Sequence, residues 1–181
     1  MRYTVIKKEE DANLDVTHRF YAVENNLPLL ADSAAGLGYF NLVPDIDGVM
    51  RRYPVAFKAG DNFYSPLFLQ VVANYLQTKD ISLTADKFGV TQIKVGDLDI
   101  PVDNKGNFLI NYYGGPKTFP HIPIVDIILG EVGREMLEGR IVLVGATGKG
   151  IFDLRATPFE RIYPGVEINA TIIDNILQGN Y

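Results

Sequence analysis

The stretch GRIVLVGATGKGIFDLRATPFERIYPGVEINATIIDNILQG at residues 139–179 gives the strongest fold signal in the chain. The apolar run IVLV at 141–144 predicts a strand that is covered on both faces. The segment VEINATIIDNIL at 166–177 has two neighbouring apolar stripes at helical spacing, so it predicts a helix buried against a sheet or a partner. A buried strand followed by a buried helix is typical of an α/β fold.

Strand and helix patterns alternate upstream of this stretch. Further strands are expected at 38–43, 48–60, 90–95, 98–102 and 107–113, and further helices at 26–36, 65–76, 124–130 and 132–138. These elements predict a single α/β domain with a mixed β-sheet flanked by helices and an amphipathic C-terminal helix that leads to a membrane. The domain should cover residues 27–181, behind a weakly patterned segment at 1–26.

Several local details follow from single residues. Ser65 is expected to cap the helix at 65–76, with Pro66 at its first position. Pro54 predicts an edge position or a bulge within 48–60. Short turns between the strands from residue 90 to 113 predict a meander.

The termini suggest a larger parent protein. The first residues resemble mid-chain sequence behind an added Met1, and the last apolar helix runs almost to Tyr181. We therefore expect the chain to be a piece of a longer protein.

Composition excludes several classes of protein and site. Apolar residues make up 47% and charged residues 22% of the chain, which is typical of a globular domain. A net charge of −5 without a Lys/Arg excess argues against nucleic acid as a partner. The absence of cysteine excludes disulfides, thiolate metal sites and cysteine nucleophiles.

Motifs for catalysis or cofactor binding are lacking. GATGKG at 145–150 has neither the glycine spacing nor the hydroxyl of a phosphate-binding loop. PDIDG at 44–48 is typical of a turn and lacks the further ligands of a calcium loop. Neither His18 nor His121 has a second histidine at metal-ligand spacing, and no serine lies in a nucleophile elbow. We expect no catalytic residue, no metal and no cofactor.

The long loop at 146–164 is the candidate ligand site. Loops of more than about 12–15 residues are uncommon in compact domains and are usually functional. Arg51 and Arg52 are adjacent on a predicted strand and should point to opposite faces, so at most one of them faces a pocket, and we favour Arg52. The alternative is a loop whose charges pair among themselves. The predicted ligand contacts are Arg52, Thr147, Asp153, Arg155 and Thr157.

Four blocks of the sequence, taken together and in order, resemble a known sensor family. The blocks are LGYFNLVPDIDGVMRRYPV (37–55), FLINYYGGPKTFPHI (108–122), GRIVLVGATGKGIFDLRATPF (139–159) and PGVEINATIIDNILQG (164–179). With the helix between them they resemble the second type of CHASE domain, the cyclase/histidine-kinase-associated sensory extracellular domains, over about residues 27–180. Members often have histidine where this chain has Asn169.

The resemblance implies a sensory module on the periplasmic side of a bacterial inner membrane, within an integral membrane protein. It implies a transmembrane anchor before the domain, membrane helices after it, and a cytoplasmic output such as an adenylate or guanylate cyclase or a histidine kinase. The chain itself would not be an enzyme, and its ligand would be a small molecule or an ion.

The expected mechanism is a displacement of the last helix when a ligand binds the neighbouring loop. The parent is expected to be a homodimer. Two other functions stay open: a spacer that dimerises without binding a ligand, and a periplasmic or cytoplasmic hydrolase with carboxylates converging in a cleft.

Overall fold

The computed structural model describes residues 3, 5–14, 17–148 and 153–181. Its helices are α1 (Pro28–Ser33), α2 (Leu67–Tyr75), α3 (Ile124–Ile128) and α4 (Gly165–Gln178), with a 3-10 helix, η2, at Arg134–Met136. Its strands are β1 (Val5–Lys8), β2 (His18–Arg19), β3 (Arg52–Pro54), β4 (Phe57–Ala59), β5 (Asn62–Tyr64), β6 (Ile81–Asp86), β7 (Gly89–Val95), β8 (Leu98–Ile100), β9 (Asn107–Leu109), β10 (Leu154–Arg155) and β11 (Tyr163–Pro164).

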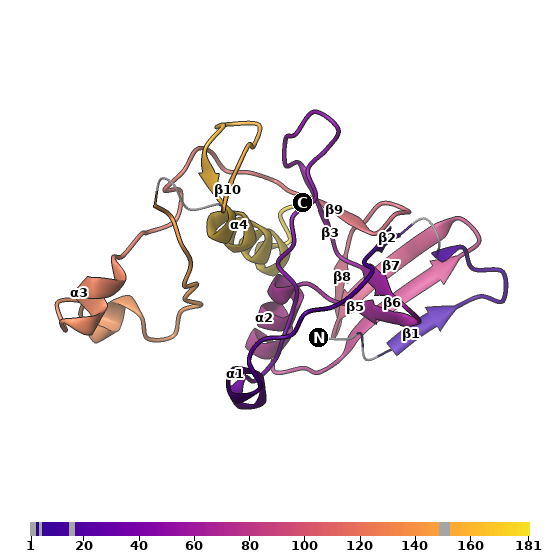
Figure 1. Ribbon diagram of the computed structural model, residues 1–181, viewed down its shortest axis with the longest axis horizontal. Coiled ribbons are helices and arrows are strands. Elements are labelled where there is room, and N and C mark those ends of the chain that lie inside the picture. Colours follow the sequence, from indigo (N-terminus) through magenta and orange to yellow (C-terminus); the bar gives the residue numbers. More distant parts are fainter. Residues whose placement is uncertain (1–2, 4, 15–16, 149–152) are drawn as a thin grey trace.

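The strands form several small sheets rather than one large one. The largest has the order β1-β6-β7-β8, with β1 parallel to β6 and the other pairs antiparallel. A second sheet has the order β2-β4-β5, and β3–β9 and β10–β11 form two-stranded pairs. The predicted mixed α/β fold in a single domain is confirmed (Figure 1).

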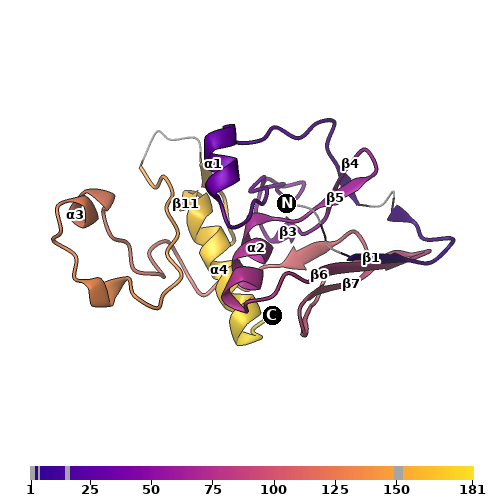
Figure 2. The same cartoon turned by 90° about the horizontal axis from the view of Figure 1, so that it is seen from below.

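The two longest helices pack against one another beside the sheets (Figure 2). The inner stripe of α4, formed by Ile168, Ile172 and Ile176, is at most 1% exposed. Its other apolar stripe, which includes Val166 and Ala170, is only partly buried. The sequence therefore predicted α4 correctly, and one of its stripes does reach the core.

The helix at 65–76 is also confirmed as α2, although its start differs from the prediction. Pro66 is the N-cap residue and receives no side-chain cap bond. Ser65 instead accepts a hydrogen bond from the Gln70 amide, with 2.7 Å between Oγ and Nε2. The expected serine cap is wrong, because α2 has Pro66 as its N-cap residue and Ser65 lies one position before it.

Three strand and helix predictions need correction. The run at 38–43 forms no strand and makes only an isolated bridge, from Tyr39 to Pro66. The predicted meander ends after β8, because β9 pairs with the distant β3. The helix expected at 26–36 is reduced to α1, which has Leu27 as its N-cap and buries none of its residues.

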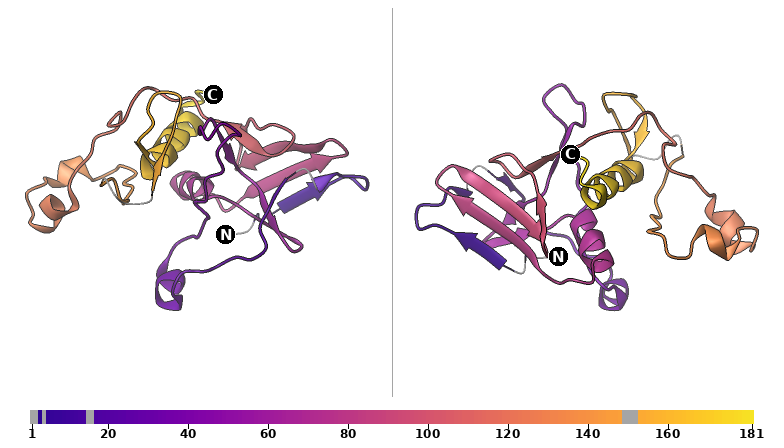
Figure 3. Two further views of the ribbon diagram at one scale, coloured as in Figure 1. Left: turned by 45° about the horizontal axis from the view of Figure 1, so that its top comes forward. Right: turned by 180° about the vertical axis from the view of Figure 1, so that it is seen from behind.

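The predicted buried strand at 141–144 is wrong. These residues form no strand, and Val142 and Val144 are 49% and 79% exposed. They belong to a projection, residues 119–145, that we call the arm. Its part with α3 and η2 stands away from the rest of the molecule (Figures 1 and 3), whereas Ile141 and Leu143 pack against the core. In the part of the chain that the structure describes, no strand pairs with this run.

Candidate ligand site at the start of α4

The start of α4 is assembled by the short β10–β11 pair. Arg155 lies opposite Tyr163 and Leu154 opposite Pro164, which brings Asp153 to the first residue of the helix. The Gly165 amide donates to the Asp153 carbonyl oxygen at 2.9 Å. A Cβ at Gly165 would overlap the present position of the Asp153 carboxylate, so a larger residue there would require this side chain to move. A carboxylate at this position is favoured by the helix dipole.

Tyr53 of β3 lies fully buried near the same carboxylate. Its ring packs edge-on against Phe68, with 5.0 Å between ring centroids. Burial raises the pKa of the Tyr53 hydroxyl, and the negative charge of Asp153 raises it further. The hydroxyl has no hydrogen-bond partner among the described residues. An unsatisfied buried donor of this kind costs about 1–3 kcal/mol.

Two other buried polar atoms without a partner in the described chain lie on or next to the start of α4. One is Oδ1 of Asn169, one turn into the helix, whose amide nitrogen donates to the Gly165 carbonyl oxygen at 3.1 Å. The other is the Tyr112 hydroxyl, whose ring lies edge-on to Tyr163 at 5.7 Å. Burial raises the pKa of Tyr112. Around this end of the helix, two hydroxyls and one amide oxygen could therefore each form a further hydrogen bond.

Two of the five predicted ligand residues come together here. Arg155 Nη2 lies 3.8 Å from Asp153 Oδ1, and the two side chains are 35% and 40% exposed. This pairing also matches the alternative in which loop charges stabilise the loop. Thr157 is buried, and its hydroxyl donates to the Glu160 carbonyl oxygen at 3.2 Å, closing a turn. Its side chain therefore has a structural contact of its own.

Arg52 is held elsewhere. Its guanidinium pairs with Asp45 at 3.1 Å, and Arg51 also pairs with Asp45, at 3.1 Å, and with Asp47, at 2.8 Å. The expectation that the two arginines point to opposite faces is wrong, because both side chains reach Asp45. The hydrogen bond from Arg51 lowers the pKa of Asp47 to about 2. The segment at 44–48 is the predicted turn, with Gly48 at a φ of 82°.

A groove between the arm and α4, which we call the α4 groove, has a volume of about 570 Å³. Its α4 wall is the half-buried stripe, and Thr147 lies on its rim. At its inner end lies Glu167, with a side chain 1% exposed, 3.2 Å from His121 Nε2. The Glu167 carboxylate also accepts from the amide of Lys117 at 3.1 Å. This contact is not among those predicted from the sequence, although an acidic residue among the apolar positions of a helix is a readable signal.

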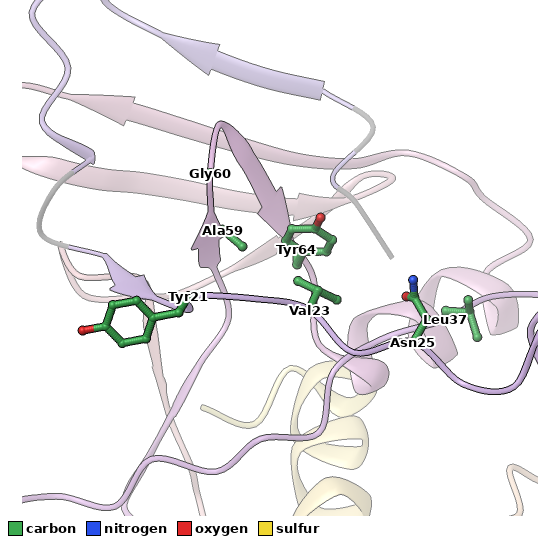
Figure 4. A pocket seen from close by; sticks show the side chains of 7 residues that line it. All are labelled: Tyr21, Val23, Asn25, Leu37, Ala59, Gly60 and Tyr64. Atoms are coloured by element: carbon green, nitrogen blue, oxygen red, sulfur yellow. The ribbon is translucent and has the colours of Figure 1, made fainter.

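A second hollow of about 720 Å³ lies beside the β4–β5 hairpin (Figure 4). Tyr64, Ala59 and Gly60 of the hairpin face Val23 and Asn25 across it. None of its lining residues is charged. It therefore offers no ionic contact to a ligand.

A comparison with protein families decides which family the chain comes from. A family model described as CHASE2 domain matches residues 4–181. The chain belongs to the CHASE2 family. Searches of curated proteins and of solved structures returned no match.

CHASE2 domains are extracellular sensory domains of signalling receptors. The family assignment confirms the resemblance found in the sequence, and the match begins well before residue 27. The family is sensory rather than catalytic, which agrees with the expectation that the chain is not an enzyme.

Two further findings concern the described residues of this CHASE2 domain. None of their helices has both the length and the apolar character needed to cross a membrane. They also contain no cluster of three or more histidine, aspartate or glutamate side chains placed to hold a metal ion.

Proposed function

We propose that this CHASE2 domain is the ligand-sensing part of a membrane-bound bacterial receptor and lies on the periplasmic side of the inner membrane. Its ligand binds at the start of α4, and α4 carries the signal to a cytoplasmic adenylate or guanylate cyclase or histidine kinase. The observation that carries this proposal is the buried hydroxyl of Tyr53, which has no hydrogen-bond partner among the described residues and whose pKa is raised in part by the charge of Asp153.

The chemistry of the site favours a small polar ligand. The Asp153 carboxylate accepts hydrogen bonds, and the Tyr53 hydroxyl and the Arg155 guanidinium can donate them. A molecule with both donor and acceptor groups would satisfy the Tyr53 hydroxyl and bind the two charged, partly exposed side chains at once. Arg52, Thr147 and Thr157 stay predicted contacts for the same ligand.

Transmission through α4 is favoured by how the helix is held. One face is fixed against α2 and the core, while its first residue is in contact with Asp153. A ligand can shift α4 only if it binds the domain more tightly when α4 is in one position than when it is in another. To change the ratio of the two populations from 1:99 to 99:1, the ligand must bind one state about 5.5 kcal/mol more tightly than the other. A few charge-assisted hydrogen bonds supply this difference.

The output of the parent receptor in its native membrane tests the proposal. Asp153→Asn removes the charge at the start of α4 and should change both the basal output and the response to the native stimulus. Asp99→Asn is the matched control, because Asp99 is an ion-paired aspartate on β8, where it pairs with Lys94. The same output and response in Asp153→Asn as in the wild type would exclude this site from signalling. Arg52→Ala, Thr147→Ala and Thr157→Ala in the same assay test the other predicted contacts.

The dimerising spacer is favoured by one specific observation, the exposed apolar surface of the arm. A spacer would bind no ligand saturably. The two functions are compatible if dimerisation and sensing use different surfaces, and we expect the parent to be a homodimer.

A further inference from the structure

The arm has the composition of a protein core but not the burial of one. No residue from 119 to 145 is buried. Large apolar side chains that would normally be covered are exposed along its length: Ile124 (57%), Val125 (52%), Ile128 (75%), Leu129 (65%), Met136 (41%), Val142 (49%) and Val144 (79%). Contiguous exposed apolar surface of this kind marks an interaction site.

The exposed area of the whole chain is larger than its mass predicts. A compact monomer of 20.1 kDa should expose about 8,700 Å². The chain exposes 11274 Å², which is about 2,500 Å² more than that expectation. A standard interface buries about 800 Å² on each partner, so a third of this excess would be enough for a stable complex.

We propose that the arm is a dimerisation element, and that a second copy of this chain packs against it across a two-fold axis. Each copy would cover the arm of the other, including Val142 and Val144 of the run that the sequence predicts to be covered on both faces. This interface does not depend on the ligand site at the start of α4.

A small ligand in the α4 groove cannot replace the second copy. Val125, Ile128 and Leu129 are not among the residues that line the groove, so a molecule bound there leaves them exposed. Covering both sides of the arm requires a macromolecule.

The charge of the arm argues against a lipid surface as its partner. The arm contains four acidic and two basic residues, Asp126, Glu131, Arg134, Glu135, Glu138 and Arg140. Anionic membranes attract clusters of lysine and arginine, which the arm lacks. Mixed charges around an apolar centre are instead compatible with a protein interface, and a two-fold homodimer is the commonest assembly of this kind.

Glycines flank the arm on both sides. Gly114 and Gly115 precede it, and Gly145 and Gly148 lie at its end. The arm is tethered to its own α4 at Glu167, through the amides of Lys117 and Phe119 and through His121. A second copy can therefore approach the apolar outer part while this base stays in place.

Sedimentation of the purified chain across the micromolar range tests the proposal. We expect the wild type to be a dimer. Leu129→Asp and, separately, Val144→Asp should each raise the dimer dissociation constant by at least about 30-fold, the loss typical of an interface hot spot. Both positions are exposed in the single chain, at 65% and 79%, so neither change should unfold it.

The matched control is Leu29→Asp on α1, where the leucine is 80% exposed and lies outside the arm. This variant should dimerise like the wild type, and circular dichroism should show the same fold for all four proteins. A monomeric wild type would overturn the proposal, whether or not the groove binds an apolar small molecule. Arm variants that dimerise as tightly as the wild type would overturn it as well.

Discussion

Tyr39 and Tyr53 lie next to each other in the core, with 6.4 Å between their ring centroids, yet their hydroxyls are in opposite situations. The Tyr39 hydroxyl donates to the Pro54 carbonyl oxygen at 2.6 Å, whereas that of Tyr53 has no partner among the described residues. The Tyr53 hydroxyl therefore lowers the stability of the fold unless a ligand bonds to it. This is why we place a ligand site at the start of α4.

Replacing each of these tyrosines by phenylalanine should therefore change stability in opposite directions. Tyr53→Phe removes an unsatisfied buried donor and should raise the free energy of unfolding by about 1 kcal/mol. Tyr39→Phe leaves the Pro54 carbonyl without its donor and should lower it by about 1 kcal/mol. Urea denaturation of the ligand-free chain measures both. A loss of stability in Tyr53→Phe equal to that in Tyr39→Phe would show that the Tyr53 hydroxyl has a partner.

At the level of elements, α4 joins the core, the ligand site and the α4 groove. Ile172 is fully buried on its inner face. Ile172→Ala should lower the free energy of unfolding by about 2–5 kcal/mol, since it leaves a cavity in the core. Leu30→Ala on α1, where the side chain is 59% exposed, should change it by less than about 0.5 kcal/mol. Similar values for the two variants in urea denaturation would contradict the assignment of the inner face.

The contact between Glu167 and the start of the arm gives a prediction for hydrogen exchange. Glu167→Gln replaces a charged acceptor, so the amides of Lys117 and Phe119 should exchange at least about tenfold faster, since such bonds contribute about 1.5–3 kcal/mol. Glu138→Gln is the control, because Glu138 makes only an exposed pair with Arg134. Unchanged exchange at both amides in Glu167→Gln would contradict the tether.

The sequence predicted some elements better than others for physical reasons. α2 and α4 were found because an apolar face at helical spacing is a local pattern. β6 was missed even though Ile81, Leu83 and Ala85 alternate with polar residues in the pattern of a half-buried strand. The pairing of β9 with β3 depends on contacts between distant residues, which no local pattern contains.

The candidate site was predictable only in part, for the same reason. Asp153 and Arg155 were found from the length of their loop and the position of that loop before the last helix. The Tyr53 hydroxyl lacks a partner among the described residues as a consequence of packing, which has no signal in composition or spacing. The strand prediction at 141–144 took apolar character as evidence of burial, and in the single chain Val142 and Val144 are exposed.

For the molecule as a whole, buried tyrosines predict instability in alkali. Burial raises the pKa of Tyr3, Tyr39 and Tyr53 above the ordinary value of about 10. Above that pH the unfolded chain loses these protons while the folded chain keeps them, so stability is full below pH 10 and falls as the pH rises. Each such tyrosine adds a slope of about 1.4 kcal/mol per pH unit.

Urea denaturation at increasing pH measures this slope. The double variant Tyr39→Phe/Tyr53→Phe removes two of these groups and should show a shallower decline than the wild type above pH 10. Equal slopes for the two proteins would mean that these hydroxyls ionise as readily in the folded chain as in the unfolded one.

The central claim, that the start of α4 is a ligand site, is tested most directly by thermal unfolding of the purified chain with a panel of amino acids, polyamines, dicarboxylates and nucleotides. At 100 times its dissociation constant a true ligand stabilises the wild type by about 2.7 kcal/mol. We predict at least one such compound, and a loss of most of its effect in Tyr53→Phe and in Asp153→Asn but not in Asp99→Asn. The claim is contradicted if no compound stabilises the wild type, or if the stabilisation is the same in all three variants.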